Sequence, residues 1–268
     1  MHFHSQSKEQ KDWYDQHAGN YDDFWVNPVS ARVVDKWNLR NLTNILKAKE
    51  VKRVLDLGCG TGKTTVELEK ISRMVVGYDI SASMLQIARD RCHDNYFIKG
   101  DSAILPFQTG IFDLVVTNGV WHHFADIETT INEVSRVLRK GGMFAVLGEN
   151  NALYKRDNQV FRFWQYLRLP VRVYNRILPI SKVKSINSPG RREIPNEPEG
   201  TEDINPLTFT TKCETVMLRK LRLYTYDHIP RIENSRYIYR VILEIEKIVG
   251  GIIAPYDGQI IQGFWVKE

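Results

Sequence analysis

The strongest local signal in this chain is the glycine-rich segment Asp56-Leu57-Gly58-Cys59-Gly60-Thr61-Gly62. It follows a short apolar run at residues 53–57 and precedes a segment with helical spacing at residues 64–71. When closely spaced glycines join a strand to a helix, the backbone can approach a ligand, and the helix start offers free N–H groups. The stretch therefore predicts a strand–turn–helix unit that binds a ligand.

The same alternation of strand and helix continues along the chain. Further strands are expected at 74–78, 96–98, 112–117 and 143–147, and helices at 29–49, 81–91 and 126–138. Gly141-Gly142 is expected to stop the last of these helices. Strand-like runs return at 221–229 and 260–266, with a helix at 235–249 between them. This order predicts an α/β fold with a doubly wound, mostly parallel sheet of seven strands.

Two phosphate-binding loops come close to the glycine stretch without fitting it. A P-loop needs four residues between its first glycine and the Gly-Lys pair, and Leu57 stands where that glycine should be. A dinucleotide loop needs a third glycine at the position of Lys63. Both therefore remain near misses.

A third pattern fits without adjustment. Residues 54–62 resemble motif I of the class I, Rossmann-like S-adenosylmethionine-dependent methyltransferases. Further segments match in order and at fitting spacing, namely residues 15–22, 78–81, 100–107, 112–116, 120–124 and 136–142. The match spans residues 14–149 and is similar to the ubiquinone/menaquinone-type and small-molecule branch. It implies S-adenosyl-L-methionine as cofactor, S-adenosyl-L-homocysteine as product, and an antiparallel last strand at residues 259–267.

The resemblance also implies which residues hold the cofactor. They are Tyr14, Tyr21, Asp56, Gly58, Cys59, Gly60, Gly62, Asp79, Ile80, Asp101, Ser102, Asn118 and Gly119. The glycines would shape the backbone around the methionine and ribose portions, and Asp56 would lie near the cofactor's amino group. Asn118 and Gly119 would line the methionine end.

Asp79 would accept both ribose hydroxyls, since a carboxylate at a strand end can act as a bidentate acceptor. Ile80 would pack on adenine. Asp101 would accept from the adenine amino group, with the Ser102 backbone nearby. A solvated strand end for Asp79 and a turn-forming role for Asp101 remain the alternatives. Tyr14 and Tyr21 would close over the cofactor, or simply pack on a surface helix.

His122 and His123 are the candidates for a catalytic base. Methyl transfer is a one-step displacement in which alignment and exclusion of water supply much of the rate. A base is needed only if the acceptor must lose a proton early. The simpler alternative is that these histidines pack or bond backbone at the strand end. We expect no metal site, because no Asp, Glu or His partner stands at ligand spacing.

Composition sets broad limits. The chain has 268 residues, 43% of them hydrophobic, and a net charge of +5, which by itself does not imply nucleic acid. Its three cysteines are widely spaced, so neither a disulfide framework nor a zinc site follows. No apolar run approaches the ~20 residues that cross a bilayer, and residues 1–8 lack the pattern of a secretory signal. A cytoplasmic location is therefore expected.

The expected organisation has four parts. They are N-terminal lid helices (1–50), a Rossmann-like core (51–150), an inserted basic and aromatic cap with a mobile loop (151–207), and the rest of the sheet (208–268). Residues 155–192 carry ten Lys or Arg and a single acid. This segment suits a solvated cap, a lid over an anionic or aromatic acceptor, or membrane-surface contact. RNA binding ranks last, because an acidic stretch adjoins the basic one.

The predicted function is methyl transfer from S-adenosylmethionine to a small-molecule or lipid-like acceptor. A non-catalytic cofactor-binding or regulatory module is one alternative, because the transfer step needs no signature nucleophile. A tRNA or rRNA methyltransferase is the other. The residues indicate neither the acceptor atom nor the oligomeric state.

Overall fold

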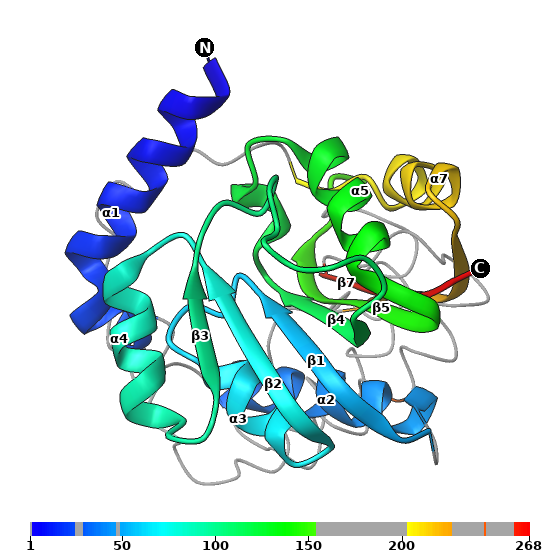
Figure 1. The fold of residues 1–268 in the computed structure, drawn as a ribbon, viewed down its shortest axis with the longest axis horizontal. Coiled ribbons are helices and arrows are strands. Elements are labelled where there is room, and N and C mark those ends of the chain that lie inside the picture. The colour runs from blue at the N-terminus through cyan, green and yellow to red at the C-terminus, as the bar shows by residue number, and fades with distance from the viewer. Residues whose placement is uncertain (1, 25–28, 47–48, 154–202, 227–243, 245–259) are drawn as a thin grey trace, which may run out of the picture.

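A seven-stranded mixed sheet forms the centre of the molecule (Figure 1). The computed structural model describes residues 2–24, 29–46, 49–153, 203–226, 244 and 260–268. The strands are β1 (Val51–Leu57), β2 (Ser72–Asp79), β3 (Tyr96–Lys99), β4 (Phe112–Asn118), β5 (Leu138–Asn150), β6 (Leu218–Tyr226) and β7 (Ile260–Lys267). Their order is β3-β2-β1-β4-β5-β7-β6, in which β7 pairs antiparallel with both β5 and β6 and all the other pairs are parallel. The predicted fold class is confirmed, including the antiparallel last strand.

Helices cover both faces of this sheet. They are α1 (His2–Phe24), α2 (Val29–Leu46), α3 (Lys63–Glu69), α4 (Ala82–Arg91), α5 (Ile127–Val137) and α7 (Pro206–Thr215), with a short 3-10 helix η1 (Trp121–His123). α2 and α3 pack on one face, and α5 and α7 lie on the other (Figure 1). α4 packs against β2 and β3, and α1 lies alongside α4.

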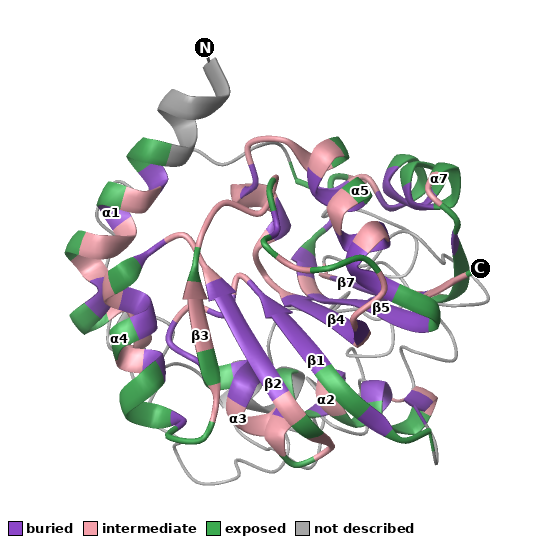
Figure 2. Ribbon diagram, viewed as in Figure 1, coloured by how far each residue is buried: buried purple, intermediate pink, exposed green. Residues whose placement is uncertain are grey.

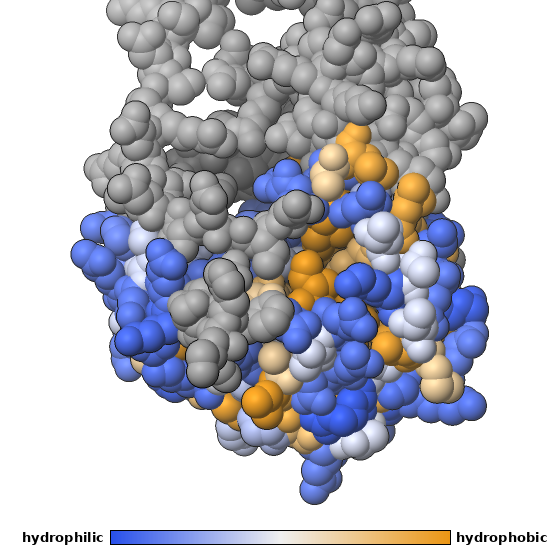
Figure 3. Space-filling model, turned by 90° about the horizontal axis from the view of Figure 1, so that it is seen from above, coloured by the Kyte–Doolittle hydropathy of each residue, from blue (hydrophilic) through white to orange (hydrophobic). Residues whose placement is uncertain are grey.

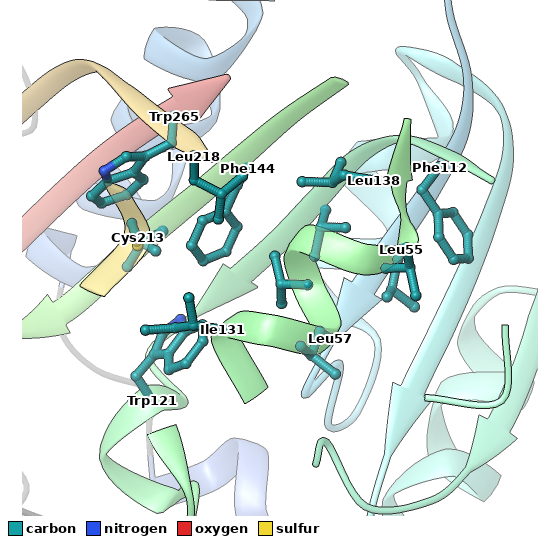
Figure 4. Packing of buried hydrophobic residues seen from close by; sticks show 14 of the residues in the cluster. Leu55, Leu57, Phe112, Trp121, Ile131, Leu138, Phe144, Cys213, Leu218 and Trp265 are labelled. Atoms are coloured by element: carbon teal, nitrogen blue, oxygen red, sulfur yellow. The ribbon is translucent and has the colours of Figure 1, made fainter. Parts of the chain in front are cut away.

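Alternating side chains of the central strands supply two cores, one for each face. On β1, Leu55 and Leu57 belong to the core beneath α5 and α7, whereas Val54 belongs to the core beneath α2 and α3. The central strands are accordingly buried toward their carboxyl ends, whereas β1 and β5 carry exposed residues near their amino ends (Figure 2). The first core is aromatic, with the Trp121 ring 5.8 Å from Phe144 between centroids (Figure 4). Such packing fixes the strand ends that carry the candidate site.

Side-chain caps start three helices of the described chain. The Ser81 hydroxyl accepts from Met84 N at 3.1 Å and begins α4. Asp126 accepts from Thr129 N at 2.9 Å and begins α5. Asn205 does the same for α7, whose first residue is a proline.

One expected helix stop is wrong. α5 ends at Val137, and Gly141-Gly142 lie within β5, where the pairing with β4 is irregular. The cause is Leu138, whose backbone is already extended and whose side chain is buried while it pairs with Phe112. Tertiary packing therefore ends the helix before the glycines are reached.

Several expectations fall outside the described residues. They concern most of the 151–207 cap and its basic segment at 155–192, the helix at 235–249, and the last residues of the strand expected at 221–229. Within the described ranges, no helix has the length and apolar character needed to span a membrane.

Candidate active site

The turn between β1 and α3 is built from three glycines with positive φ. Gly58, Gly60 and Gly62 have φ of 74°, 51° and 79°, which other residues adopt only with strain. A Cβ on Gly58 would lie 2.4 Å from Val120 Cγ2, and one on Gly62 would lie 3.1 Å from Ala88 Cβ. A Cβ on Gly60 would have no neighbour within 4 Å. Gly58 is thus required by packing, a Cβ at Gly62 would press on Ala88, and Gly60 borders open space.

Asp79, at the carboxyl end of β2, is held against this turn. Its Oδ2 accepts from Gly60 N at 2.8 Å, and its Oδ1 accepts from Ser81 N at 2.9 Å. Burial raises the pKa of Asp79, and these backbone donors oppose that rise. A carboxylate offers about four lone-pair sites, so two such bonds orient the group and leave capacity for ligand hydroxyls.

Asp56 lies beneath the turn. It is 1% exposed and accepts from the Thr65 hydroxyl at 2.6 Å. Burial, with a smaller contribution from the charge of Asp79, raises the pKa of Asp56 to about 7. Its carboxylate therefore joins β1 to α3, and its bond to a ligand amino group stays a prediction. Cys59 is also buried, and burial raises the pKa of its thiol, which stays protonated at neutral pH.

The remaining loop residues lie around the ends of β3 and β4. Asp101 Oδ1 accepts from Ala103 N at 2.9 Å, which is the turn-forming contact, and the Ser102 hydroxyl bonds that of Thr130. These two residues and Ile80 are partly exposed. At the end of β4, Asn118 donates to the Thr64 hydroxyl at 3.1 Å, and Gly119 N donates to Leu147 O.

Helix α1 reaches the far side of the site. Tyr14 Oη lies 2.9 Å from His123 Nε2, and the rings of Tyr14 and Tyr21 are 5.8 Å apart between centroids. The structure therefore brings both tyrosines together and joins one of them to the histidine pair. Whether they close over a cofactor stays a prediction.

The two histidines have different surroundings. Burial, aided by His122, lowers the pKa of His123 to about 3, so that ring is neutral at physiological pH. His122 Nδ1 lies 3.2 Å from Glu149 Oε2, and its side chain is 25% exposed. The ring centroids of the pair are 3.9 Å apart. Of the two, His122 is the better placed to exchange a proton with a ligand.

Glu149 is a functional candidate that sequence reasoning missed. It lies near the end of β5, is fully buried, and its Oε1 accepts from Val120 N at 2.6 Å and Trp121 N at 3.1 Å. Its second oxygen faces His122. The available signal was an acid two residues after the fifth apolar run, near the end of its strand as Asp79 is of β2.

Two carboxylates of α1, Asp15 and Asp22, were also missed. Asp15 accepts from the Ser81 hydroxyl at 2.6 Å, and Asp22 accepts from the Thr61 hydroxyl at 2.8 Å. Their seven-residue spacing on a helix was the available signal, since it places them on one face.

The hydrogen-bonding groups around the turn suit a ligand with hydroxyl groups better than a phosphate. Asp79 and Asp101 are acceptors, and Lys63, the basic residue nearest the turn in sequence, pairs with Asp22 at 3.1 Å.

Figure 3 shows the molecule from above, the direction toward which the arrowheads of β1, β2 and β3 point in Figure 1. Apolar surface gathers toward the middle of that face, between hydrophilic areas. Among the described side chains, no group of three or more His, Cys, Asp or Glu could hold a metal ion.

Known proteins resemble this chain in sequence and in fold. Residues 55–146 match a family model described as methyltransferase domain. A demethylmenaquinone methyltransferase of Thermus thermophilus is 36% identical over 118 residues, which cover 42% of this chain and 53% of the relative. One of Staphylococcus saprophyticus is 28% identical over 182 residues, which cover 65% and 76%. The match spans about half the length of the Thermus relative.

The fold comparison agrees. A solved S-adenosylmethionine-dependent methyltransferase of Thermotoga maritima has a TM-score of 0.58 at 17% identity, covering 97% of this chain and 100% of that one. The fold and the matched residues define a class I, Rossmann-like S-adenosylmethionine-dependent methyltransferase domain. The curated relatives similar to this chain include proteins named demethylmenaquinone methyltransferase and ubiquinone/menaquinone biosynthesis C-methyltransferase. The resemblance identified from the sequence is confirmed.

Proposed function

We propose that this protein transfers a methyl group from S-adenosylmethionine to a small-molecule or lipid-like acceptor. The observation that carries the proposal is the Asp79 carboxylate, hydrogen-bonded to Gly60 N, in a turn where Gly60 borders open space. A ligand that bears hydroxyl groups and lacks phosphate fits a site in which a carboxylate is the acceptor. The match of residues 55–146 to a methyltransferase domain supports the same conclusion.

The residues present fit the cofactor. Asp79 would hold the ribose hydroxyls, Asp101 and Ile80 would receive the adenine, and the 118–119 turn would border the methionine portion. The cofactor supplies an electrophilic sulfonium methyl group. The protein's task is then to align the acceptor with that methyl group and to exclude water, which is how a one-step displacement is accelerated.

His122 would take the proton of an acceptor that must ionise before it attacks. Glu149 accepts at one oxygen from two backbone N–H groups and faces His122 Nδ1 with the other. A buried carboxylate in that position stabilises the protonated imidazole. The demethylmenaquinone methyltransferases among the relatives favour a quinone-type acceptor, whose reduced quinol form carries hydroxyl groups.

Turnover with labelled cofactor tests this proposal. The protein is incubated with methyl-labelled S-adenosylmethionine and, separately, a short-chain demethylmenaquinol, simple phenols and bulk tRNA. We expect label to enter the quinol or a phenol, and His122→Ala to lower that rate at least tenfold. Label in tRNA alone would replace the proposed acceptor class. Cofactor binding without transfer to any acceptor in the panel would favour the non-catalytic module.

A further inference from the structure

One face of helix α1 carries two carboxylates that contact the cofactor motifs of the core. Asp15 and Asp22 are seven residues apart, and a spacing of two helical turns places them on the same side of the helix. Both are largely covered, with side-chain exposures of 26% and 27%. They come from a helix far from those motifs in sequence, so α1 must dock for the contacts to form.

Asp15 binds the start of α4. Its Oδ1 accepts from the Ser81 hydroxyl at 2.6 Å and from Ser83 N at 3.1 Å. Ser81 in turn donates its own N–H to Asp79 Oδ1 at 2.9 Å. Ser81 therefore links the Asp15 carboxylate to Asp79, the proposed ribose acceptor, through two hydrogen bonds. Lys11, one turn earlier on α1, lies 3.4 Å from the other oxygen of Asp15.

Asp22 binds the glycine turn itself. Its Oδ1 accepts from the Thr61 hydroxyl at 2.8 Å and lies 3.1 Å from Lys63 Nζ, while Oδ2 pairs with Arg91. Arg91 also donates to Thr61 O at 2.6 Å, which ties the turn to α4. Thr61 directly follows Gly60, whose N–H donates to Asp79 Oδ2 at 2.8 Å.

The two contacts converge on one carboxylate. Each oxygen of Asp79 has one of these backbone donors, Ser81 N or Gly60 N. Asp15 accepts a hydrogen bond from Ser81, which is one of these donor residues. Asp22 accepts one from Thr61, which follows the other donor residue, Gly60. Hydrogen bonds to a charged group are roughly twice as strong as neutral ones, so removing either carboxylate should loosen one side of the cradle around Asp79.

We propose that docked helix α1 is part of the cofactor site, and that Asp15 and Asp22 are the positioning residues through which its docking orients Asp79. This inference rests on the proposed function. It makes cofactor affinity depend on residues that do not touch the cofactor. Because coupling between two equilibria is reciprocal, bound cofactor should also hold α1 in place.

The test compares Asp15→Ala and Asp22→Ala with Asp12→Ala in the full chain. Asp12 lies on the same helix, is 57% exposed, and pairs with its neighbour Lys11, so it is a matched control. Two quantities are measured, namely the affinity for S-adenosylhomocysteine by calorimetry and the amide exchange of Gly60 and Ser81 in the ligand-free protein. If an alanine variant does not fold, Asp15→Asn or Asp22→Asn replaces it, because the amide keeps one acceptor oxygen.

We expect each variant to weaken binding about tenfold and to speed exchange at the donor on its own side of Asp79, whereas Asp12→Ala stays within about twofold of wild type for both. Unchanged affinity, or weakened affinity without faster exchange, would overturn the inference. If the wild type does not bind S-adenosylhomocysteine, the proposed function fails. Exchange in the ligand-free protein then decides separately whether α1 holds the turn.

Discussion

At the scale of single residues, Gly58 and Gly60 share a positive φ but border different surroundings. A Cβ on Gly58 would meet Val120 Cγ2 at 2.4 Å, and one on Gly60 would enter open space. We expect Gly60→Ala to fold with a loss of roughly 1–2 kcal/mol and to bind S-adenosylhomocysteine at least tenfold more weakly, because its methyl group fills the ligand's space. Gly58→Ala should lose about 3 kcal/mol or more, since overpacking adds to the strain.

Urea denaturation and calorimetry of the two variants check this prediction. Wild-type affinity in Gly60→Ala would mean that the open space at the turn is not used by the cofactor. Equal destabilisation of the two variants would contradict the packing argument.

Asp56 makes stability depend on pH. Burial raises its pKa to about 7 in the folded protein, whereas an unfolded Asp titrates near pH ~3.9. Below that value both states are protonated. Between pH ~4 and ~7 only the unfolded state ionises, so stability falls as pH rises, by up to about 4 kcal/mol in total. Asp56→Asn should remove this slope and keep an acceptor for Thr65. An unchanged slope in urea titrations from pH 4 to 8 would show that another group causes it.

Local signals explain which site residues could be predicted. Asp79 and the glycines lie directly after strands that short apolar runs predict, so the motif places them at the same strand ends as the structure does. The Tyr14–His123 contact joins residues 109 positions apart, and no local pattern encodes such a pairing. Glu149 was missed because a buried acid after a strand looks the same in sequence as a solvated one.

At the scale of elements, the end of β5 fixes the turn that follows β4. Glu149 is fully buried and accepts from Val120 N and Trp121 N. Glu149→Ala leaves those two donors without the carboxylate, so we expect a loss of about 2–4 kcal/mol. Glu128→Ala, whose side chain is 74% exposed, should change stability by less than about 0.5 kcal/mol. Equal losses in chemical denaturation would contradict this role.

Element boundaries were predictable where the signal lies within the element. Ser81, Asp126 and Asn205 cap their helices through side chains two or three residues away from the donors. The end of α5 was not predictable in this way. Leu138 is drawn into the sheet by its pairing with Phe112, and that long-range contact outweighs the glycine pair at 141–142.

At the scale of the whole molecule, the alternation of strands and helices was enough to predict a parallel sheet with helices on both faces. The antiparallel β7 came from family resemblance, because hydrophobic pattern does not encode strand direction. The docking of α1 was expected as a lid, whereas its carboxylate contacts depend on how the chain packs. The same packing joins α1, the glycine turn and the start of α4 around Asp79.

Calorimetric titration with S-adenosylhomocysteine tests whether Asp79 and the glycine turn bind this cofactor. Wild type, Asp79→Ala and the exposed control Asp94→Ala are compared, with ATP and NAD as control ligands. We expect saturable binding of S-adenosylhomocysteine to wild type and Asp94→Ala, at least tenfold weaker binding to Asp79→Ala, and no binding of ATP or NAD. Binding of ATP or NAD without S-adenosylhomocysteine, or full affinity in Asp79→Ala, would contradict this expectation.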